Sequence, residues 1–459
     1  MKAKRLGILA PAPLLAVVGV AVASFTFLGT PSTLAVPILG FLGIVATFLL
    51  ARMQDPEEDL RFLLNLMLLG VAARFLVFTL IHETIGPYLF APDQLTYESW
   101  GRSLLNHWTQ GTPLPRQLRD TLQVGYPAIN AGLFAVFGEA KVAPAVLNIF
   151  FSVWTAIPIY NVVRILLPDE PRVARISAGF SVLFPSLILW STLNIREGPT
   201  ILAVVSAVYF LVRMQRKTEL AALVGAFVSL AILTLFREYL TSLVGIAGAA
   251  GVLMGRSRSP VRSLAAGSVM LVAVTIAFQS LGLGGSLTGE PTLERAQALR
   301  ESFQMGAGSA YGTGADVSTT AGAISYLPIG LAYFLLAPFP WDIGSALQAI
   351  TLPETMLWWA IFPFGVWGAL LILRRQVRAF TVPLSVLLMV TVAYAMVESN
   401  VGTAYRHRGQ VLPLMFIFCS IGIWHLLTRL RARREAERER RRRARESLRS
   451  AVHPSQRVS

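Results

Sequence analysis

An acidic residue at the start of the first long polar interval is the best candidate for a base in this chain. Asp93 directly follows Pro92, which ends the preceding helix because proline lacks the amide hydrogen that a helix needs. From Asp93 onward, Tyr97, Trp100 and Leu104 recur at helical spacing, which predicts an amphipathic helix along a membrane interface. A carboxylate at the mouth of a helical bundle can serve as a general base, and a solvated loop aspartate is the alternative.

Two very short turns between apolar segments carry an arginine followed by a glutamate. They are Arg196-Glu197 and Arg237-Glu238. Charges at membrane depth are costly unless they are paired or functional, so these side chains pair with one another, reach the interface, or line a site. Together with Asp93 they fall on one face of the predicted bundle, so a site there and simple pairing at the interface both stay open.

A third polar turn, 398–408, ends in two arginines that flank a histidine. Arg406, His407 and Arg408 lie just before a membrane segment, and two guanidinium groups beside an imidazole suit a phosphate anion. An interfacial anchor is the alternative, but basic anchors favour the inner side of a membrane and this turn is predicted outside.

Two further residues could take part in binding. Arg74 lies in the middle third of an apolar segment and must face the protein interior or a wet cavity. Tyr126 brings a hydroxyl to the interface, where aromatic rings also serve as anchors. The five histidines show no ligand spacing and the single cysteine, Cys419, lies in an apolar segment. We therefore predict no cofactor and no metal site, and leave a divalent metal open.

The elements that must position these residues are membrane helices. Hydrophobic residues make up 54% of the 459 residues, charged residues only 14%, and the mean hydropathy is +0.60, which excludes a soluble globular protein. We predict an all-α polytopic membrane protein with about twelve transmembrane helices. The expected segments are 6–28, 33–51, 62–86, 142–166, 176–193, 197–213, 219–235, 239–254, 263–281, 355–373, 380–397 and 411–428. Two short Gly- and Pro-rich stretches, 125–138 and 326–340, are expected to be re-entrant or interfacial.

The distribution of Lys and Arg predicts that both termini lie inside, in the cytoplasm. The interval 87–124, the loop 282–325 and the turn 398–408 are then outside. The tail 429–459 contains twelve Arg and four Glu, so it is expected on the cytoplasmic side, where it can contact anionic membrane lipids. No nucleic-acid-binding fold is visible. Residues 1–23 are interpreted as an uncleaved helix, with a cleaved signal as the alternative.

The long outer loop 282–325 is rich in Gly, Ser and Thr and contains a charged, helix-forming piece at 290–301. A loop of this kind is either a mobile lid over a site or a plain connector.

The order of these features resembles the GT-C superfamily of integral-membrane glycosyltransferases. The similarity is to the branch of the protein O-mannosyltransferases and the lipid A aminoarabinose transferases. That branch has an arginine-bearing membrane helix, an outer loop that opens with a catalytic Asp followed by a Tyr, and a Pro-containing segment that ends in Phe-Gly. The chain offers, in this order, Arg74, Asp93 with Tyr97, Gly125-Tyr126-Pro127 and Phe137-Gly138.

The likeness covers residues 62–215, and the chain departs from the family pattern at two points. Gln94 follows Asp93 where the family usually has a second acidic residue, and Tyr126-Pro127-Ala128 stands for Pro-Pro-Leu. The expected organisation is therefore two additional helices in 1–61, a GT-C-like catalytic domain in 62–428, and the basic tail in 429–459.

The resemblance implies a transferase in the cell inner membrane whose donor is a sugar on a polyprenyl phosphate. The acceptor would be an unidentified glycan, lipid or protein outside the cytoplasm, and transfer would invert the sugar with Asp93 as general base. Cationic side chains would stabilise the leaving phosphate. The implied binding residues are Arg196, Arg237, Arg406 and Arg408, with His407 and Tyr126 assisting, and with Tyr97, Arg74 and Glu197 nearby.

Two other classes of function stay open. A polysaccharide polymerase or ligase of the O-antigen type also takes lipid-linked sugars, and its essential residues would lie in 282–325 or in Arg406-His407-Arg408. A transporter or flippase of lipid-linked sugars would place polar residues through the depth of several helices, whereas the charges here gather on one face.

Overall fold

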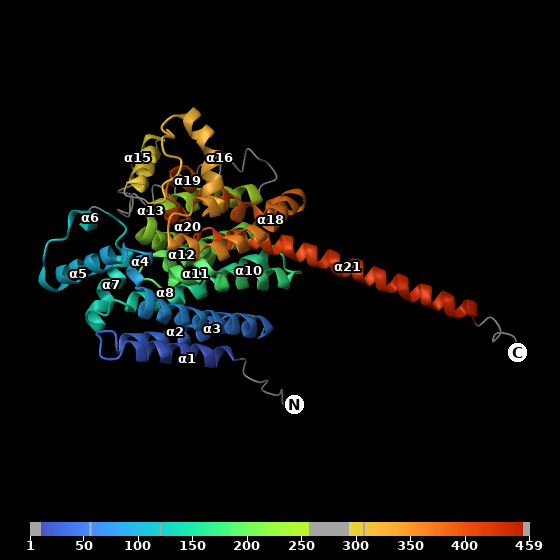
Figure 1. Ribbon diagram of the computed structural model, residues 1–459, viewed down its shortest axis with the longest axis horizontal. Helices are drawn as coiled ribbons and strands as arrows, with labels where there is room; N and C mark the ends of the chain where they lie inside the picture. The colour runs from blue at the N-terminus through green and yellow to red at the C-terminus, as the bar shows by residue number, and fades with distance from the viewer. Residues whose placement is uncertain (1–10, 55–56, 120, 257–292, 306–307, 453–459) are drawn as a thin grey trace.

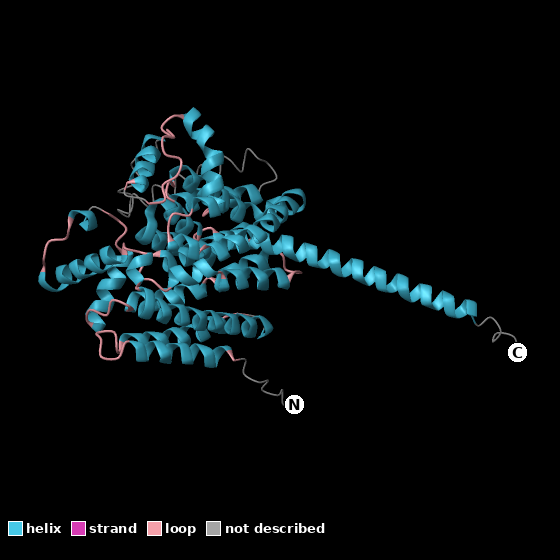
Figure 2. Cartoon of the chain, viewed as in Figure 1, coloured by secondary structure: helices cyan, strands magenta, loops and turns pink. Residues whose placement is uncertain are grey.

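A computed structural model describes residues 11–54, 57–119, 121–256, 293–305 and 308–452 of the chain. Over these residues every regular element is a helix, apart from one isolated β-bridge between Ala310 and Asn400 (Figure 2). The predicted class, an all-α polytopic membrane protein, is confirmed.

The first three helices lie together along one edge of the bundle (Figure 1). They are α1 (Ala12–Thr26), α2 (Ala35–Arg52) and α3 (Glu57–Leu80). Large apolar side chains on the opposite faces of α1 and α2 are exposed, as expected of helices that face lipid. Against its neighbours α1 buries a stripe of small residues at helical spacing, which allows close approach of the backbones: Ala12, Ala16, Val20 and Ala23.

Six helices follow one another through the middle of the chain. α10 and α11 meet at an angle of 47° at Phe184, because Pro185 has no amide hydrogen to continue the helical ladder. The bounds are α8 (Ala143–Trp154), α9 (Ala156–Leu166), α10 (Pro171–Leu183), α11 (Pro185–Ser191), α12 (Glu197–Arg216) and α13 (Leu220–Arg256).

The 37 residues of α13 form two helices that fold back on each other rather than one straight rod. The backbone is non-helical at Arg237, with φ −152° and ψ 88°. Thr241 donates a hydrogen bond to the carbonyl of Leu230 over 3.3 Å, whereas residues eleven apart in a straight helix are about 16 Å apart. This geometry agrees with the two predicted segments, 219–235 and 239–254, with the charged turn between them.

The C-terminal part of the chain adds the remaining helices and the tail. The predicted helical piece at 290–301 is confirmed as α15 from residue 293, and residues 290–292 lie outside the described residues. α16 begins at Thr320, so the polar loop ends earlier than the predicted residue 325. The bounds are α15 (Leu293–Gln304), α16 (Thr320–Leu336), α17 (Ala346–Ile350), α18 (Leu352–Arg375), α19 (Thr381–Val397), α20 (Val401–Arg408) and α21 (Leu412–Val452).

The last helix runs far beyond the bundle (Figure 1). Its 41 residues make a rod of about 60 Å, and the side chains from 429 to 448 are all exposed. Two pairs of arginine and glutamate one turn apart, Arg442–Glu446 and Arg443–Glu439, support the helix outside the bundle. The basic tail is therefore a continuation of the last membrane helix in the described residues.

Eight helices in the described part of the chain are long and apolar enough to cross a membrane, and the bent pair α10–α11 makes a ninth. In this count α13 is one helix although its halves fold back, and α1, with 15 residues, falls below the length limit. The predicted segment 263–281 lies outside the described residues, so the total of about twelve stays a prediction. The two short predicted stretches are helical, as α7 and α16.

A set of short helices forms the end of the bundle that lies opposite both termini (Figure 1). They are α4 (Pro87–Phe90), α5 (Gln94–Gln110), α6 (Arg116–Arg119) and α7 (Gly125–Phe137). The amphipathic helix predicted from Asp93 onward is confirmed as α5, because its buried residues recur at helical spacing: Gln94, Tyr97, Glu98, Gly101 and Leu104.

Candidate active site

Asp93 occupies the residue just before the first turn of α5, as the preceding proline predicts. An aspartate at this position usually accepts hydrogen bonds from the amides of the first helical turn, but the Asp93 side chain makes no such bond. Its Oδ2 instead lies 2.9 Å from Nη1 of Arg406, and 39% of its side chain is exposed. The carboxylate is thus held by another element and is still open to a ligand.

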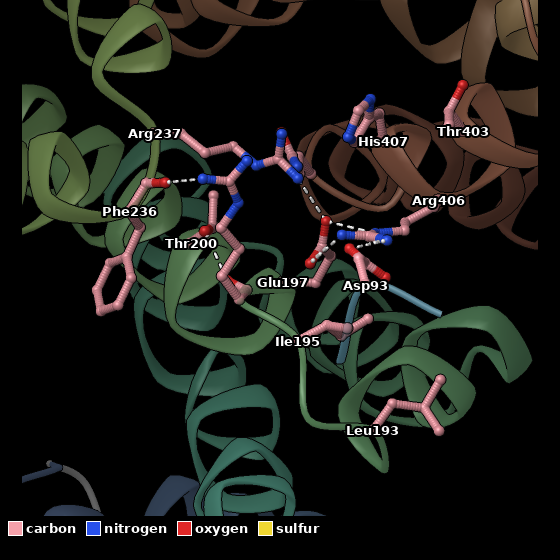
Figure 3. Close-up of polar contacts among 12 residues, drawn as sticks. Asp93, Leu193, Ile195, Glu197, Thr200, Phe236, Arg237, Thr403, Arg406 and His407 are labelled. Carbon is pink, nitrogen blue, oxygen red and sulfur yellow. Dashed lines mark hydrogen bonds and ion pairs between the residues drawn. The ribbon is translucent and has the colours of Figure 1, made fainter. Parts of the chain in front are cut away.

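Arg406 joins Asp93 to a buried carboxylate on the opposite side of the site (Figure 3). Its Nε lies 2.8 Å from Oε1 of Glu197 and its Nη2 3.3 Å from Oε2, while its Nη1 binds Asp93. The same Oε1 of Glu197 accepts a hydrogen bond from Nη2 of Arg237 over 2.6 Å. Burial alone would lower the pKa of Arg406, but the negative charges of Glu197 and Asp93 raise that pKa above its usual value. Arg406 is therefore positively charged and held between two carboxylates.

Glu197 is only 1% exposed and begins α12. A carboxylate at the start of a helix lies close to the unpaired amides and the positive end of the helix dipole. The break in α13 is what brings Arg237 to Glu197, because the non-helical residue turns the guanidinium toward the start of α12. The negative charge of a buried carboxylate between two arginines is paired, which offsets much of the free-energy cost of its burial.

Two tyrosines and an asparagine connect the helices near Asp93. The ring of Tyr97 packs edge-on against the ring of Tyr126, with centroids 5.0 Å apart. The Tyr126 hydroxyl accepts a hydrogen bond of 2.8 Å from Asn148, whose amide also donates to the carbonyl of Ile195 over 2.6 Å. α5, α7 and the turn before α12 are thereby fixed to one another.

Arg196 is the third cation at this end of the bundle. Its Nη1 donates to Gln123 and, over 2.9 Å, to the carbonyl of Phe236. The Nε atoms of Arg196 and Arg237 are both buried and have no hydrogen-bond partner within the described residues. A buried guanidinium with an unused donor can bind an anion, because the unmet hydrogen bond is costly to leave open.

An apolar groove of about 320 Å³ is lined by Phe236, the residue before Arg237, but by none of the three arginines. The carbonyl of Phe236 binds Arg196, and α12 contributes to the lining one turn after another from Pro199 to Ser206. The remaining lining residues come from α8, α12 and α13: Phe151, Leu202, Ala203, Ser229 and Ile232. The groove therefore runs along α12 from the charged end of the bundle toward the middle of the apolar segment.

His407 faces a different carboxylate from the one that Arg406 binds. Its Nδ1 makes a short hydrogen bond with Glu398, and its ring stacks on Tyr394 with centroids 5.1 Å apart. Burial, reinforced by the charge of Arg237, lowers the pKa of His407 below its usual value. We infer a neutral imidazole in the folded protein.

Two of the predicted site residues lie elsewhere. Arg408 is buried and donates to the carbonyls of Leu335 and Ala337 at the end of α16, over 2.9 and 2.8 Å. Side chains two residues apart on a helix point in different directions, so Arg406 and Arg408 do not converge on one anion.

Arg74 is fully buried inside the bundle. It donates to the hydroxyls of Ser191 and Ser152, each over 2.9 Å, and to the carbonyl of Val182 over 2.8 Å. Val182 lies in the last turn of α10, where carbonyls lack a helical partner. In these contacts Arg74 fixes the bend between α10 and α11 to α3, and it reaches no other predicted site residue.

The structure reveals polar residues of the site that sequence reasoning did not select. Gln94 directly follows Asp93 and is 2% exposed. Its amide binds the carbonyls of Pro87 and Ala91, and its Oε1 accepts from the amide of Asn194 over 2.8 Å. Glu398 and Asn148 were likewise not predicted as site residues. Their role depends on contacts with residues far away in the sequence, so no local spacing could reveal it.

Metal ligands are sparse at this end of the bundle. Within the described residues no group of three or more His, Cys, Asp or Glu side chains could hold a metal ion.

The many apolar helices of this chain, together with a match to one family model, support a membrane glycosyltransferase of GT-C type. Residues 124–280 match the family model for dolichyl-phosphate-mannose-protein mannosyltransferases, which confirms the predicted resemblance. The matched range contains Arg196, Glu197 and Arg237 but not Asp93. No curated protein and no solved structure matches the chain.

Proposed function

We propose that this protein transfers a sugar from a polyprenyl-phosphate donor to an acceptor outside the cytoplasm, with Asp93 as general base. The observation that carries the proposal is the pairing of Asp93 with Arg406, which joins a partly exposed carboxylate through Glu197 to Arg237. Phe236, the residue before Arg237, lines an apolar groove, and its carbonyl binds Arg196. The family whose model matches residues 124–280 uses a lipid phosphate-sugar donor, as its description states.

In the proposed reaction the acceptor hydroxyl attacks the anomeric carbon of the donor sugar. As the new C–O bond forms, the bond between that carbon and the phosphate oxygen breaks, and Asp93 takes the hydroxyl proton. The polyprenyl phosphate leaves with one additional negative charge. Arg196, Arg237 and Arg406 stabilise this charge, since buried or partly buried donors act in a low dielectric. A single displacement inverts the configuration at the anomeric carbon of the sugar.

The groove beside Phe236 suits the first isoprene units of the donor. It is apolar along α12 and α13, and it begins where Arg196 binds the carbonyl of Phe236. A donor seated there would have its tail in the bilayer and its phosphate at the arginines. We further propose that this end of the bundle faces away from the cytoplasm, that both termini are cytoplasmic, and that no cofactor is required.

The experiment that tests this function is transfer of labelled sugar from polyprenyl-phosphate donors to cell-envelope acceptors by the purified protein. Asp93→Asn retains the size of the side chain and removes the base. We expect its turnover to fall at least about 100-fold, because general bases contribute about 10²- to 10⁴-fold. Donor binding should persist.

Glu139→Gln is the matched control for the loss of a carboxylate. Glu139 pairs with Arg102 on the outer surface, and 59% of its side chain is exposed. Its variant should transfer sugar like the wild type. Equal activity of Asp93→Asn and wild type would overturn Asp93 as the base.

The polymerase or ligase alternative predicts a different pattern of loss. It centres the essential residues on 282–325 or on Arg406 and Arg408, with Asp93 dispensable. Full activity of Asp93→Asn together with inactive Arg406→Gln would favour that alternative.

A further inference from the structure

An outer segment, residues 308–312, is bound to the turn that leads into α20. The amide of Tyr311 donates to the carbonyl of Ser399 over 2.8 Å, and the amide of Val401 donates to the carbonyl of Ser309 over 3.0 Å. These bonds belong to the isolated bridge between Ala310 and Asn400. The predicted outer loop is therefore attached, over these residues, to the element that carries Arg406.

Arg300 of α15 lies at the centre of this attachment and is 0% exposed. Its guanidinium stacks over the ring of Tyr326 at 3.8 Å from the centroid. Its Nη2 donates to the carbonyl of Gly312 over 2.6 Å, and its Nη1 to the carbonyl of Glu398 over 3.3 Å. The carbonyl of Arg300 itself accepts a hydrogen bond of 2.6 Å from the hydroxyl of Ser399.

The residues that Arg300 holds also fix the orientation of α20. The side chain of Glu398 binds His407 and accepts a hydrogen bond of 2.6 Å from Thr403. Asn400 caps the first turn, because its Oδ1 accepts from the amide of Gly402 over 2.8 Å. α20 is only eight residues long, so its direction depends on these contacts at its start.

We propose that Arg300 is a positioning residue for the transfer reaction and acts through α20. Its guanidinium binds the carbonyl of Glu398 and its backbone carbonyl binds Ser399, and these contacts hold α20 in the orientation that places Arg406 between Asp93 and Glu197. The outer segment is then a structural part of the catalytic end of the protein. This inference rests on the proposed function for its effect on transfer, but its effect on α20 is independent of that function.

Arg300→Gln tests the inference in two ways. Hydrogen exchange of the purified protein should show faster exchange of the amides of 401–408 than in the wild type, with exchange in α3 and α12 unchanged. Turnover should fall by up to about 100-fold, because a displacement of about 1 Å in a catalytic group costs that much.

A double-mutant cycle separates positioning from a merely structural role. If Arg300 acts through Arg406, the substitution Arg300→Gln should reduce turnover much less in an Arg406→Gln protein than in the wild type. Equal losses in both backgrounds would overturn the inference, as would normal turnover of Arg300→Gln. If the glutamine variant fails to fold, Arg300→Lys retains the charge but forms fewer directed hydrogen bonds, and the same cycle applies.

Gln297→Ala is the matched control on the same helix. The side chain of Gln297 accepts a hydrogen bond of 3.0 Å from the amide of Val317 and donates one to Glu301, so it binds the chain beyond the outer segment 308–312. Its turnover should match the wild type. If the wild type transfers no sugar from any donor, the proposed function fails while the exchange experiment still decides the role of Arg300. Unchanged hydrogen exchange of the amides of 401–408 would then overturn the inference that Arg300 positions α20.

Discussion

At the scale of single residues, Arg196 differs from the other two arginines of the candidate site. Arg406 and Arg237 both bind the carboxylate of Glu197, and Arg406 also binds Asp93. Arg196 instead donates to the side-chain oxygen of Gln123 and to the carbonyl of Phe236, which are both uncharged. A guanidinium with neutral acceptors keeps its positive charge available to an anion, such as a lipid phosphate.

His407 provides a prediction about pH. The groups that face it are the carboxylate of Glu398, the ring of Tyr394, and the positive charges of Arg237 and Arg406. Its pKa is lowered on folding, so the unfolded chain binds a proton first as the pH falls. The stabilisation from neutral His407 is fully present above about pH 6.5 and decreases as the pH falls below that value.

The thermal unfolding temperature of detergent-solubilised protein between pH 5 and pH 8 measures this effect. The wild type should lose stability toward pH 5, and His407→Gln should lose less over the same interval. His107→Gln, a change at an exposed histidine of α5, should behave like the wild type. Parallel pH profiles for wild type and His407→Gln would contradict a neutral His407 in the folded state.

At the scale of elements, the position of Asp93 depends on how closely α5 lies on α7. A Cβ atom at Gly101 of α5 would lie 2.6 Å from the Cβ of Asn130 and 3.3 Å from the amide of Ala131. No side chain fits at that distance, so the glycine sets the separation of the two helices. Asp93 begins the same helix and would move with it.

Gly101→Val should therefore separate α5 from α7. We expect a loss of stability of about 1–3 kcal/mol, as overpacking in a packed interior typically costs. We also expect loss of transfer activity, since Asp93 leaves Arg406. Thermal unfolding and the transfer assay measure the two effects.

Gly132→Ala, on α7, is the control for this packing. A Cβ atom at Gly132 meets no atom within 4 Å, so activity should stay at the wild-type level. Stability should not fall, since alanine is a better helix former than glycine. Wild-type stability of Gly101→Val would show that α5 can shift without cost.

At the scale of the whole molecule, the two ends of the bundle differ. The helices α4, α5 and α6 lie at one end, and both chain termini lie at the other (Figure 1). Asp93 directly precedes α5. Asp59 at the start of α3 pairs with Arg164 and Arg175, which ties α3, α9 and α10 together. Separation of the candidate site from the termini allows the two to lie on opposite sides of a membrane.

Cysteine labelling can determine which end faces outward. Cys419 is the only cysteine and is buried, so the background reaction should be low. Thr109→Cys on α5 and Glu437→Cys on α21 place thiols at exposed positions of the two ends. A membrane-impermeant maleimide should label Thr109→Cys in intact cells, and Glu437→Cys only after the membrane is permeabilised.

The reverse pattern would place Asp93 in the cytoplasm and contradict the proposed function. Labelling of both variants in intact cells would contradict the arrangement of the two ends itself.

The sequence alone determined the class of protein and most of the helices. Runs of apolar residues can only be buried or face lipid, so their length and order predict α2, α3, α12, α18 and α19 without knowledge of their contacts. The proline before Asp93 and the spacing of Tyr97 and Leu104 likewise predict α5, because both signals are local.

The tertiary structure decided which of the predicted charges meet. Asp93, Glu197 and Arg406 come from three distant parts of the chain, and only the packing of α5, α12 and α20 brings them within hydrogen-bond distance. Arg408 differs from Arg406 by only two residues, yet it binds carbonyls of α16. The direction in which a charged side chain points depends on how its helix packs. For that reason the contacts of Arg300 and Glu398 could be found only in the folded protein.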